Sequence, residues 1–213
     1  MELAMHPDAR FWDKIADKYS KRPIADEAAY ERKLSISKDY FRADMDVLEF
    51  GCGTGGTALH HAPNVASIHA IDVSPRMIEI AKNKQASAKA ENVNFEVGSI
   101  ETLDVPDQSY DAILAMSVLH LLQDKEMVIN KVYRLLRPGG VFISSTACIG
   151  DGLKIFKYIE PIGRALGLMP AVKVFNAKQL IETLEASGFQ IEYQWQPGKL
   201  KATFIVARTG RAT

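Results

Sequence analysis

Short apolar runs alternate with longer stretches of helical periodicity from Val47 onward. The runs are typical of buried strands, and the ranges that they predict are 47–50, 67–72, 93–97, 110–116, 141–145, 189–195 and 202–207. The periodic stretches predict helices at 57–61, 75–90, 124–136 and 177–187. Ser74 is the expected N-cap of the second helix, and the segment 137–140 is expected to end the third.

Strand–helix alternation at this spacing predicts parallel strands with right-handed crossovers, and hence a doubly wound, Rossmann-like α/β sheet. The last two strands differ, because the short connection 196–201 contains Pro197-Gly198 and favours an antiparallel C-terminal hairpin. Two regions lie outside the alternation. Residues 1–46 are expected to form a helical N-terminal cap on a core at 47–213. The apolar segment 148–175 is expected to act as a substrate lid within that core.

The amino-acid composition argues against several classes of protein. The 213 residues contain 26 Lys and Arg against 26 Asp and Glu, a balance that argues against bulk capture of nucleic acid. Two cysteines, Cys52 and Cys148, exclude a disulfide scaffold. We find neither a stretch apolar enough to span a bilayer nor an N-terminal signal pattern, so we expect a cytoplasmic protein without a transmembrane segment.

A glycine-rich loop follows the first predicted strand and opens the next helix, with the sequence Glu-Phe-Gly-Cys-Gly-Thr-Gly-Gly at 49–56. Glycines at this place let the backbone turn sharply and approach a ligand closely. Asp72 ends the next strand, 21 residues after Gly51, where a carboxylate can accept hydrogen bonds from both hydroxyls of a ribose. The combination predicts a cofactor that contains a nucleoside; the alternative is a tight turn beside a surface acid.

Four blocks in order resemble the class I S-adenosylmethionine-dependent methyltransferases. They read Val-Leu-Glu-Phe-Gly-Cys-Gly-Thr-Gly at 47–55, Ile-Asp-Val-Ser-Pro-Arg-Met at 71–77, Val-Pro-Asp-Gln-Ser-Tyr-Asp-Ala-Ile at 105–113 and Leu-Leu-Arg-Pro-Gly-Gly at 135–140. The resemblance implies S-adenosylmethionine as cofactor, S-adenosylhomocysteine as product and methyl transfer as the activity. A nicotinamide-dependent oxidoreductase is the alternative enzyme class, but it is not expected to carry Glu49 together with the block at 135–140.

The resemblance also implies the cofactor-binding residues. They are Tyr19, Glu49, Gly51, Cys52, Gly53, Asp72, Val73, Met77, Ser99, Ile100 and Ala115. Glu49 would hold the cationic methionyl end, and Asp72 would hold the ribose. Ser99 stands where the family often has an acid that accepts from the adenine amine, and Glu101 could take that role instead. Met77 could equally belong to the helix core. Tyr19 could face the sulfonium through a cation–π contact or simply pack in its helix.

His120 is the candidate general base, because it comes just after the strand 110–116, at the edge of the sheet where ligands bind. The resemblance places this segment next to the methyl group, and an imidazole suits proton abstraction from a phenol, enol or thiol. The alternative is a histidine that packs or caps the next helix. We find no cluster of ligands at metal-binding spacing, so no metal is predicted.

These observations favour methyl transfer to an oxygen of a small, partly hydrophobic or aromatic acceptor. Three alternatives remain open. The acceptor atom could be nitrogen, sulfur or carbon, the acceptor could be a macromolecule, or the protein could bind the cofactor without turnover. No nucleic-acid partner is expected, because no basic stripe with interleaved aromatic residues is visible.

Overall fold

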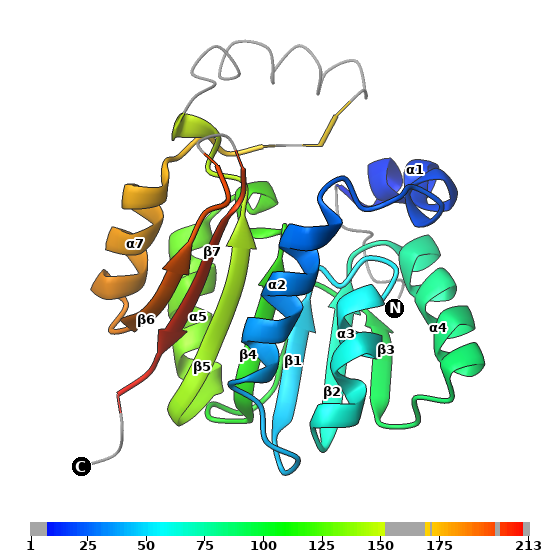
Figure 1. Cartoon of the computed structure of the whole chain (residues 1–213), viewed down its shortest axis with the longest axis horizontal. Coiled ribbons are helices and arrows are strands. Elements are labelled where there is room, and N and C mark those ends of the chain that lie inside the picture. Colours follow the sequence, from blue (N-terminus) through cyan, green and yellow to red (C-terminus); the bar gives the residue numbers. More distant parts are fainter. Residues whose placement is uncertain (1–7, 152–168, 171, 199–200, 211–213) are drawn as a thin grey trace. The chain divides into compact units, whose positions relative to one another are not determined.

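The computed structural model describes residues 8–151, 169–170, 172–198 and 201–210. The sheet has seven strands, and the chain divides into an N-terminal unit, Met1–Leu103, and a C-terminal unit, Asp104–Thr213 (Figure 1). Each unit is described by itself. Most of the segment predicted as a substrate lid lies outside the described residues.

The N-terminal unit holds three parallel strands in the order β3-β2-β1. Its elements are α1 (Ala9–Ser20), α2 (Glu27–Lys38), β1 (Asp46–Phe50), α3 (Gly56–His61), η1 (Ala62–Asn64), β2 (Ser67–Asp72), α4 (Pro75–Ala88) and β3 (Val93–Val97). Val47 pairs with Ile68 in register, and Ile68 pairs with Val93. Parallel strands end at the same edge, so the loop after β1 and the loop after β2 are neighbours.

Local chemistry explains where these helices begin. The Ser74 side chain accepts a hydrogen bond from the backbone N–H of Met77, and Pro75 occupies the first turn of α4. The Asp26 carboxylate caps α2 in the same way by accepting from the N–H of Ala29. The core of the unit consists of fully buried side chains from β1, β2, α4 and β3, among them Leu48, Phe50, Ile68, Ile71, Met77 and Phe95.

The C-terminal unit holds four strands in the order β4-β5-β7-β6. Its elements are β4 (Tyr110–Met116), η2 (Leu119–Leu121), α5 (Lys125–Leu135), β5 (Leu136–Thr146), η3 (Ile149–Asp151), α7 (Ala177–Ala186), β6 (Gln190–Trp195) and β7 (Thr203–Arg208). β4 and β5 are parallel, whereas β7 runs antiparallel to both β5 and β6. Phe189 contacts Tyr133 of α5 and Phe142 of β5, which fixes the end of α7 on the face of the sheet that α5 covers.

The prediction of a mostly parallel, doubly wound sheet with an antiparallel C-terminal hairpin is confirmed. The third predicted helix, α5, ends just before 137–140 as expected, but the strand that follows begins at Leu136 and not at Val141, so these four residues belong to β5. Residues that follow β7 pair with this segment: Gly139, at φ +79°, donates its N–H to Gly210 O, and Thr209 N–H donates to Gly140 O. None of the helices in the described part of the chain combines the length and apolar character needed to cross a membrane.

Candidate cofactor site

The glycine loop between β1 and α3 requires its glycines. Gly53 and Gly55 adopt φ angles of +53° and +77°, in the left-handed region that side chains rarely enter. A Cβ on Gly55 would also lie 2.6 Å from Cζ of Phe95, so the loop could not pack on β3 with any other residue there. A Cβ built on Gly53 would lie 3.9 Å from Cε1 of Tyr19, which places the tyrosine ring of α1 beside the loop.

Asp72 lies at the carboxyl end of β2 and is 8% exposed. Its Oδ2 accepts from the Gly53 N–H at 2.8 Å, and its Oδ1 accepts from the Ser74 N–H at 2.9 Å. Burial nevertheless raises the pKa of this carboxyl above its usual value. Each carboxylate oxygen has a further lone pair, so the geometry leaves Asp72 able to accept from two vicinal hydroxyls.

Glu49 is a buried carboxyl at the end of β1, only 1% exposed. The Ala58 N–H of α3 donates to it, but Oε2 has no hydrogen-bond partner among the described residues. Burial, and then the nearby Asp72 carboxylate, raise the pKa of Glu49 to about 8. A cation placed at this unpartnered oxygen would favour the ionised form of Glu49 and offset its repulsion by the second acid.

Two tyrosines from the N-terminal helices lie at the loop. Tyr19 of α1 is 47% exposed, and its partial removal from water, followed by the charge of the Asp72 carboxylate, raises its pKa. Tyr30 of α2 places its hydroxyl 3.3 Å from Oγ1 of Thr57, at the start of α3. Because burial and the charge of Glu49 both contribute to raising the Tyr30 pKa, this side chain also belongs to the surroundings of the acid.

The remaining predicted residues of the N-terminal unit surround the carboxyl ends of β1, β2 and β3. Val73 is half-buried between Asp72 and Ser74, whereas Met77 and Ile100 are each only 2% exposed and contribute to the core. Ser99 and Glu101, the two alternatives for the adenine amine, are joined by a 2.7 Å hydrogen bond from the serine hydroxyl to the carboxylate.

Cys52 lies in the loop and is 7% exposed. Its backbone N–H donates to Ile71 O at 3.1 Å, which ties the loop to the end of β2. Burial raises the pKa of its thiol well above the usual value, and the Glu49 and Asp72 carboxylates raise it further. A thiol in these surroundings stays protonated and is a poor nucleophile, which favours the interpretation of Cys52 as a small spacing residue.

Ala115 and His120 belong to the C-terminal unit. Ala115 is fully buried near the end of β4, and His120 follows in η2. Ser117 between them adopts φ +63°, with its N–H bonded to Ser145 O at 2.7 Å, so a tight turn sets the direction of η2. The backbone O of His120 accepts from the Lys173 N–H at 2.8 Å. Nδ1 of His120 is buried without a partner in the described part of the chain, and burial lowers the imidazole pKa to about 4.

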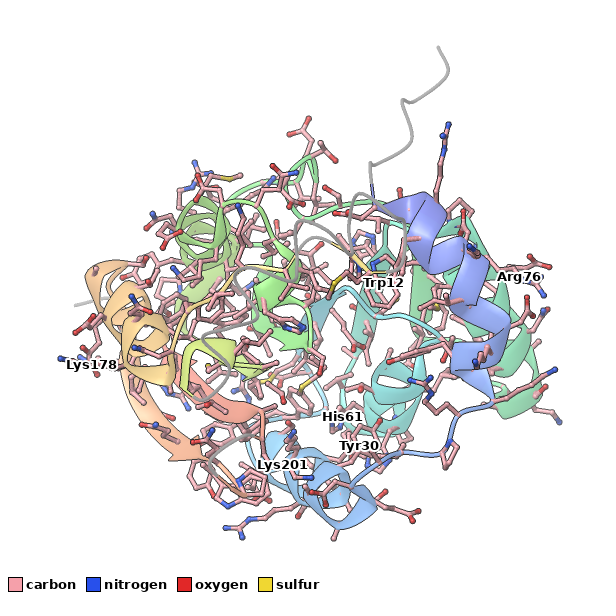
Figure 2. All side chains as sticks on the ribbon, turned by 90° about the horizontal axis from the view of Figure 1, so that it is seen from above. Trp12, Tyr30, His61, Arg76, Lys178 and Lys201 are labelled. Carbon is pink, nitrogen blue, oxygen red and sulfur yellow. The ribbon has the colours of Figure 1, made fainter. Side chains whose placement is uncertain are left out.

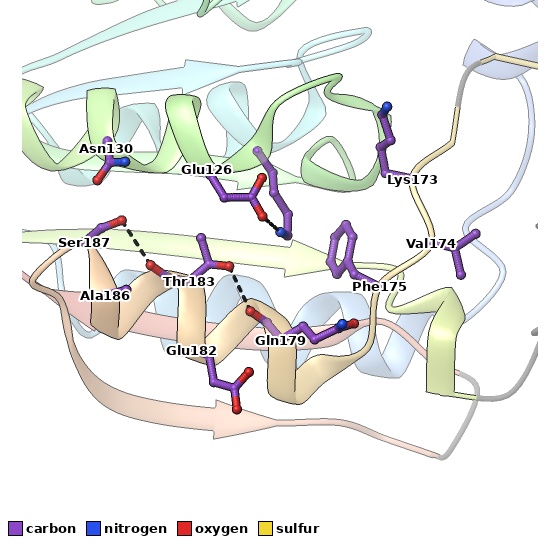
Figure 3. Close-up of a pocket in the computed structure, with 11 residues that line it drawn as sticks. Glu126, Asn130, Lys173, Val174, Phe175, Gln179, Glu182, Thr183, Ala186 and Ser187 are labelled. Carbon is purple, nitrogen blue, oxygen red and sulfur yellow. Dashed lines mark hydrogen bonds and ion pairs between the residues drawn. The ribbon is translucent and has the colours of Figure 1, made fainter.

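A cavity lies between α5 and α7 in the C-terminal unit and has a volume of about 630 Å³ (Figure 3). Its walls carry both charges and amides, with Glu126 and Asn130 on α5 and Gln179 and Glu182 on α7. None of the individual cofactor or catalytic residues predicted from the sequence lines it, but residues 173–175 of the predicted lid segment do. No metal-binding cluster of His, Cys, Asp and Glu occurs within the residues that the structure describes.

The sequence alone did not predict the residues of α1 and α4 that form hydrogen bonds to the glycine loop and to the start of α4. Asp13 of α1 accepts from Ser74 and Arg76, and Lys84 of α4 donates to Thr54 of the loop at 2.8 Å. One signal was available: α4 has no acidic residue in its first turn, where an acid is stabilising, so an acid from elsewhere in the chain fits there.

The donor set fits S-adenosylmethionine. The unused oxygen of Glu49 suits a cation, the Asp72 carboxylate suits a ribose, and the left-handed glycines keep side chains out of the space at the loop. Two buried acids, Glu49 of β1 and Asp72 of β2, flank the loop, and their negative charges disfavour the pyrophosphate of a dinucleotide.

Comparison with known proteins agrees with this fit. Residues 41–204 match the family model described as a methyltransferase domain. The methyltransferase YcgJ of Bacillus subtilis is 31% identical over 132 residues, which cover 62% of this chain and 52% of the relative. A malonyl-[acyl-carrier protein] O-methyltransferase of Paenibacillus is 29% identical over 155 residues, which cover 69% of this chain and 56% of that protein. The matched region thus spans about half the length of these relatives.

The fold has close counterparts among solved structures. A crystal structure of an S-adenosylmethionine-dependent methyltransferase from Methanosarcina mazei superposes with a TM-score of 0.68 at 20% identity, covering 83% of this chain and 98% of the other. At this identity the likeness shows the fold alone, whereas the family model covers most of the chain. The chain belongs to the class I S-adenosylmethionine-dependent methyltransferases.

Proposed function

We propose that this protein transfers a methyl group from S-adenosylmethionine to an oxygen atom of a small, partly hydrophobic or aromatic acceptor. The assignment of S-adenosylmethionine as cofactor rests on one observation. Oε2 of Glu49 is buried without a partner among the described residues, close to Asp72 and to a loop whose glycines adopt positive φ angles. S-adenosylmethionine, when bound, supplies a methyl group already activated on a sulfonium, so the protein has to align the acceptor and exclude water.

The oxygen acceptor is inferred from His120. Its lowered pKa keeps the imidazole neutral at pH 7. Its buried Nδ1 has no hydrogen-bond partner among the described residues, so this nitrogen is available to accept a proton. A base with a pKa near 4 is weak, so it suits a hydroxyl that becomes acidic as transfer proceeds, such as a phenol or enol. The O-methyltransferase among the relatives supports this choice, whereas others are named C- and N-methyltransferases and define the alternatives.

The proposal is tested by incubating the protein and a metabolite extract with methyl-labelled S-adenosylmethionine, followed by separation of small molecules from protein and nucleic acid. We expect label in a small organic product, identified by its mass, and none when the Asp72→Ala variant replaces the wild type. Label found in the protein or nucleic-acid fraction would overturn the choice of a small-molecule acceptor. Cofactor binding without any labelled product would support a non-catalytic role.

The affinity for cofactor should rise with pH below about 8. Glu49 is protonated below its pKa of about 8, and a bound cation favours the ionised form, so binding must release that proton. Among the described residues of the N-terminal unit, Asp72, Cys52 and Tyr30 also interact with this carboxyl, and their pKa values are all raised. Calorimetry with S-adenosylmethionine from pH 6 to 9 should therefore show affinity increasing toward a plateau above pH 8.

Glu49→Gln is the matched control, because the amide has the same shape and does not ionise. Its cofactor affinity should be lower and nearly independent of pH between 6 and 8. The apo proteins give a second readout: since the folded pKa lies above the unfolded value of 4.5, the stability due to Glu49 is complete below pH 4.5 and lost as pH rises through 8. Glu49→Gln should accordingly gain thermal stability over wild type as pH rises. A flat affinity profile in the wild type would contradict the assignment.

A further inference from the structure

A continuous series of hydrogen bonds joins helix α1 to the carboxylate of Asp72. Oδ1 of Asp13 accepts from the Ser74 hydroxyl at 2.5 Å, and the Ser74 N–H donates to Oδ1 of Asp72 at 2.9 Å. The other oxygen of Asp72 accepts from the Gly53 N–H at 2.8 Å. The series therefore runs from α1 through the start of α4 to the glycine loop.

Ser74 is the residue on which this series depends. It is fully buried, and its single hydroxyl both donates to Asp13 and accepts from the Met77 N–H at 3.1 Å. Asp13 also accepts from the Arg76 N–H at 3.0 Å, so it satisfies a second free donor in the first turn of α4. One carboxylate on α1 thus fixes the backbone and the capping side chain that follow Asp72.

A second contact between the same helices offers a natural comparison. The Arg76 guanidinium, which Figure 2 shows beside α1, pairs with Asp17 at 2.7 Å and 3.2 Å. The Asp17 side chain is 62% exposed and the Arg76 side chain 38%, so this pair lies in solvent and contributes little. Asp13 and Asp17 lie one helical turn apart on α1, but only Asp13 is connected to Asp72.

Asp13 also acts on Asp72 through its charge. Burial is the main cause of the raised pKa of Asp72, and the negative charge of Asp13 raises it further. Tyr19, on the same helix as Asp13, responds in turn to the Asp72 carboxylate and lies beside Gly53. Helix α1 therefore interacts with Asp72 both through Ser74 and through Tyr19.

We propose that Asp13 is a positioning residue for the cofactor: through Ser74 it holds Asp72 in the orientation that accepts the ribose hydroxyls, and it couples docking of α1 to cofactor binding. The proposal rests on the proposed function in one respect, the assignment of Asp72 to the ribose. A small displacement of the Asp72 carboxylate would weaken its hydrogen bonds to the ribose. A residue that does not touch the cofactor can therefore control the affinity of the protein for it.

The test compares Asp13→Ala, Asp13→Asn, Asp17→Ala and Asp72→Ala by calorimetry with S-adenosylhomocysteine. Asp13→Ala should lose about tenfold in affinity, the equivalent of one hydrogen bond to a charged group. Asp17→Ala should stay within about twofold of wild type, because an exposed ion pair is worth little. Asp13→Asn keeps an oxygen that can accept from Ser74 and Arg76, so it should recover most of the loss.

Two measurements on the apo protein separate positioning from a general loss of structure. Hydrogen exchange should show faster exchange at the Ser74, Arg76 and Met77 amides in Asp13→Ala than in Asp17→Ala. A carboxyl titration by carbon NMR should show a lower pKa for Asp72 in Asp13→Asn, since the neighbouring charge is gone.

Three outcomes are distinguishable. Equal affinities for Asp13→Ala and Asp17→Ala, together with lost binding in Asp72→Ala, would overturn the positioning role and leave the proposed function intact. Unchanged affinity in Asp72→Ala would overturn the ribose assignment and, with it, the role given to Asp13. Weak binding by Asp13→Ala with rescue by Asp13→Asn would support both.

Discussion

Asp72→Ala should lower the affinity for S-adenosylhomocysteine at least tenfold. The substitution removes a buried carboxylate that is placed to accept from both ribose hydroxyls, and hydrogen bonds to a charged group are worth about 1.5–3 kcal/mol each. It also leaves the Gly53 and Ser74 N–H groups without their acceptor, so the glycine loop and the start of α4 lose one hydrogen bond each. Calorimetry well below the melting temperature measures the affinity of the folded protein.

Asp72→Asn is the matched control for this experiment. The amide retains one acceptor oxygen but no charge, so its affinity should lie between those of wild type and Asp72→Ala. Melting curves for both variants separate lost binding from lost folding. An affinity unchanged in Asp72→Ala would remove the ribose assignment.

His120→Ala should reduce turnover by roughly 10²–10⁴, the usual range for the loss of a general base. Cofactor affinity should stay nearly constant, because the cofactor is assigned to the glycine loop, Glu49 and Asp72. The wild-type rate should fall as pH drops through about 4, where the buried imidazole becomes protonated, and the variant should lack this limb. Stopped assays across pH, corrected for the folded fraction, measure both effects.

Stability gives an independent readout of the same histidine. Its folded pKa lies below the ordinary value of 6.5, so the stability associated with the neutral imidazole is present above pH 6.5 and lost as pH falls through about 4. His120→Ala should therefore lose less stability on acidification than wild type. A variant that melts earlier but keeps its rate per folded molecule would make His120 a packing residue. A stable variant with full activity and an unchanged pH profile would remove the reason for choosing oxygen.

The bounds of three strands were predictable from the sequence alone, because the ranges predicted for β2, β3 and β4 match the structure at both ends. β4 is buried along most of its length, as its apolar run indicates, whereas β3 lies at the edge of the sheet and alternates between buried and exposed positions. Ser74 was equally clear, since a serine followed by proline is a local signal for a helix start. The early start of β5 at Leu136 was missed because the partners of 137–140, Thr209 and Gly210, lie some seventy residues later in the chain.

The candidate site likewise combines features that depend on neighbouring residues with features that depend on distant ones. The glycine loop and Asp72 were predictable because they belong to a motif of residues close together in the sequence. The state of Glu49 depends on burial and on Asp72, so its raised pKa could not be inferred from a motif. Asp13 and Ser74 are 61 positions apart: the first turn of α4 lacks an acid, but no local feature identifies Asp13 as the acid that supplies it. The choice between Ser99 and Glu101 was likewise left open by the sequence, and the structure shows that the two side chains interact.

The atom that receives the methyl group is the central claim, and carbon NMR of the product tests it most directly. The protein is incubated with acceptor and with S-adenosylmethionine that carries carbon-13 in its methyl group, and the chemical shift of the labelled carbon in the isolated product is recorded. We predict a methoxy signal in a small organic product, formed by wild type and strongly reduced with His120→Ala. A labelled methyl on nitrogen, sulfur or carbon would contradict the oxygen assignment.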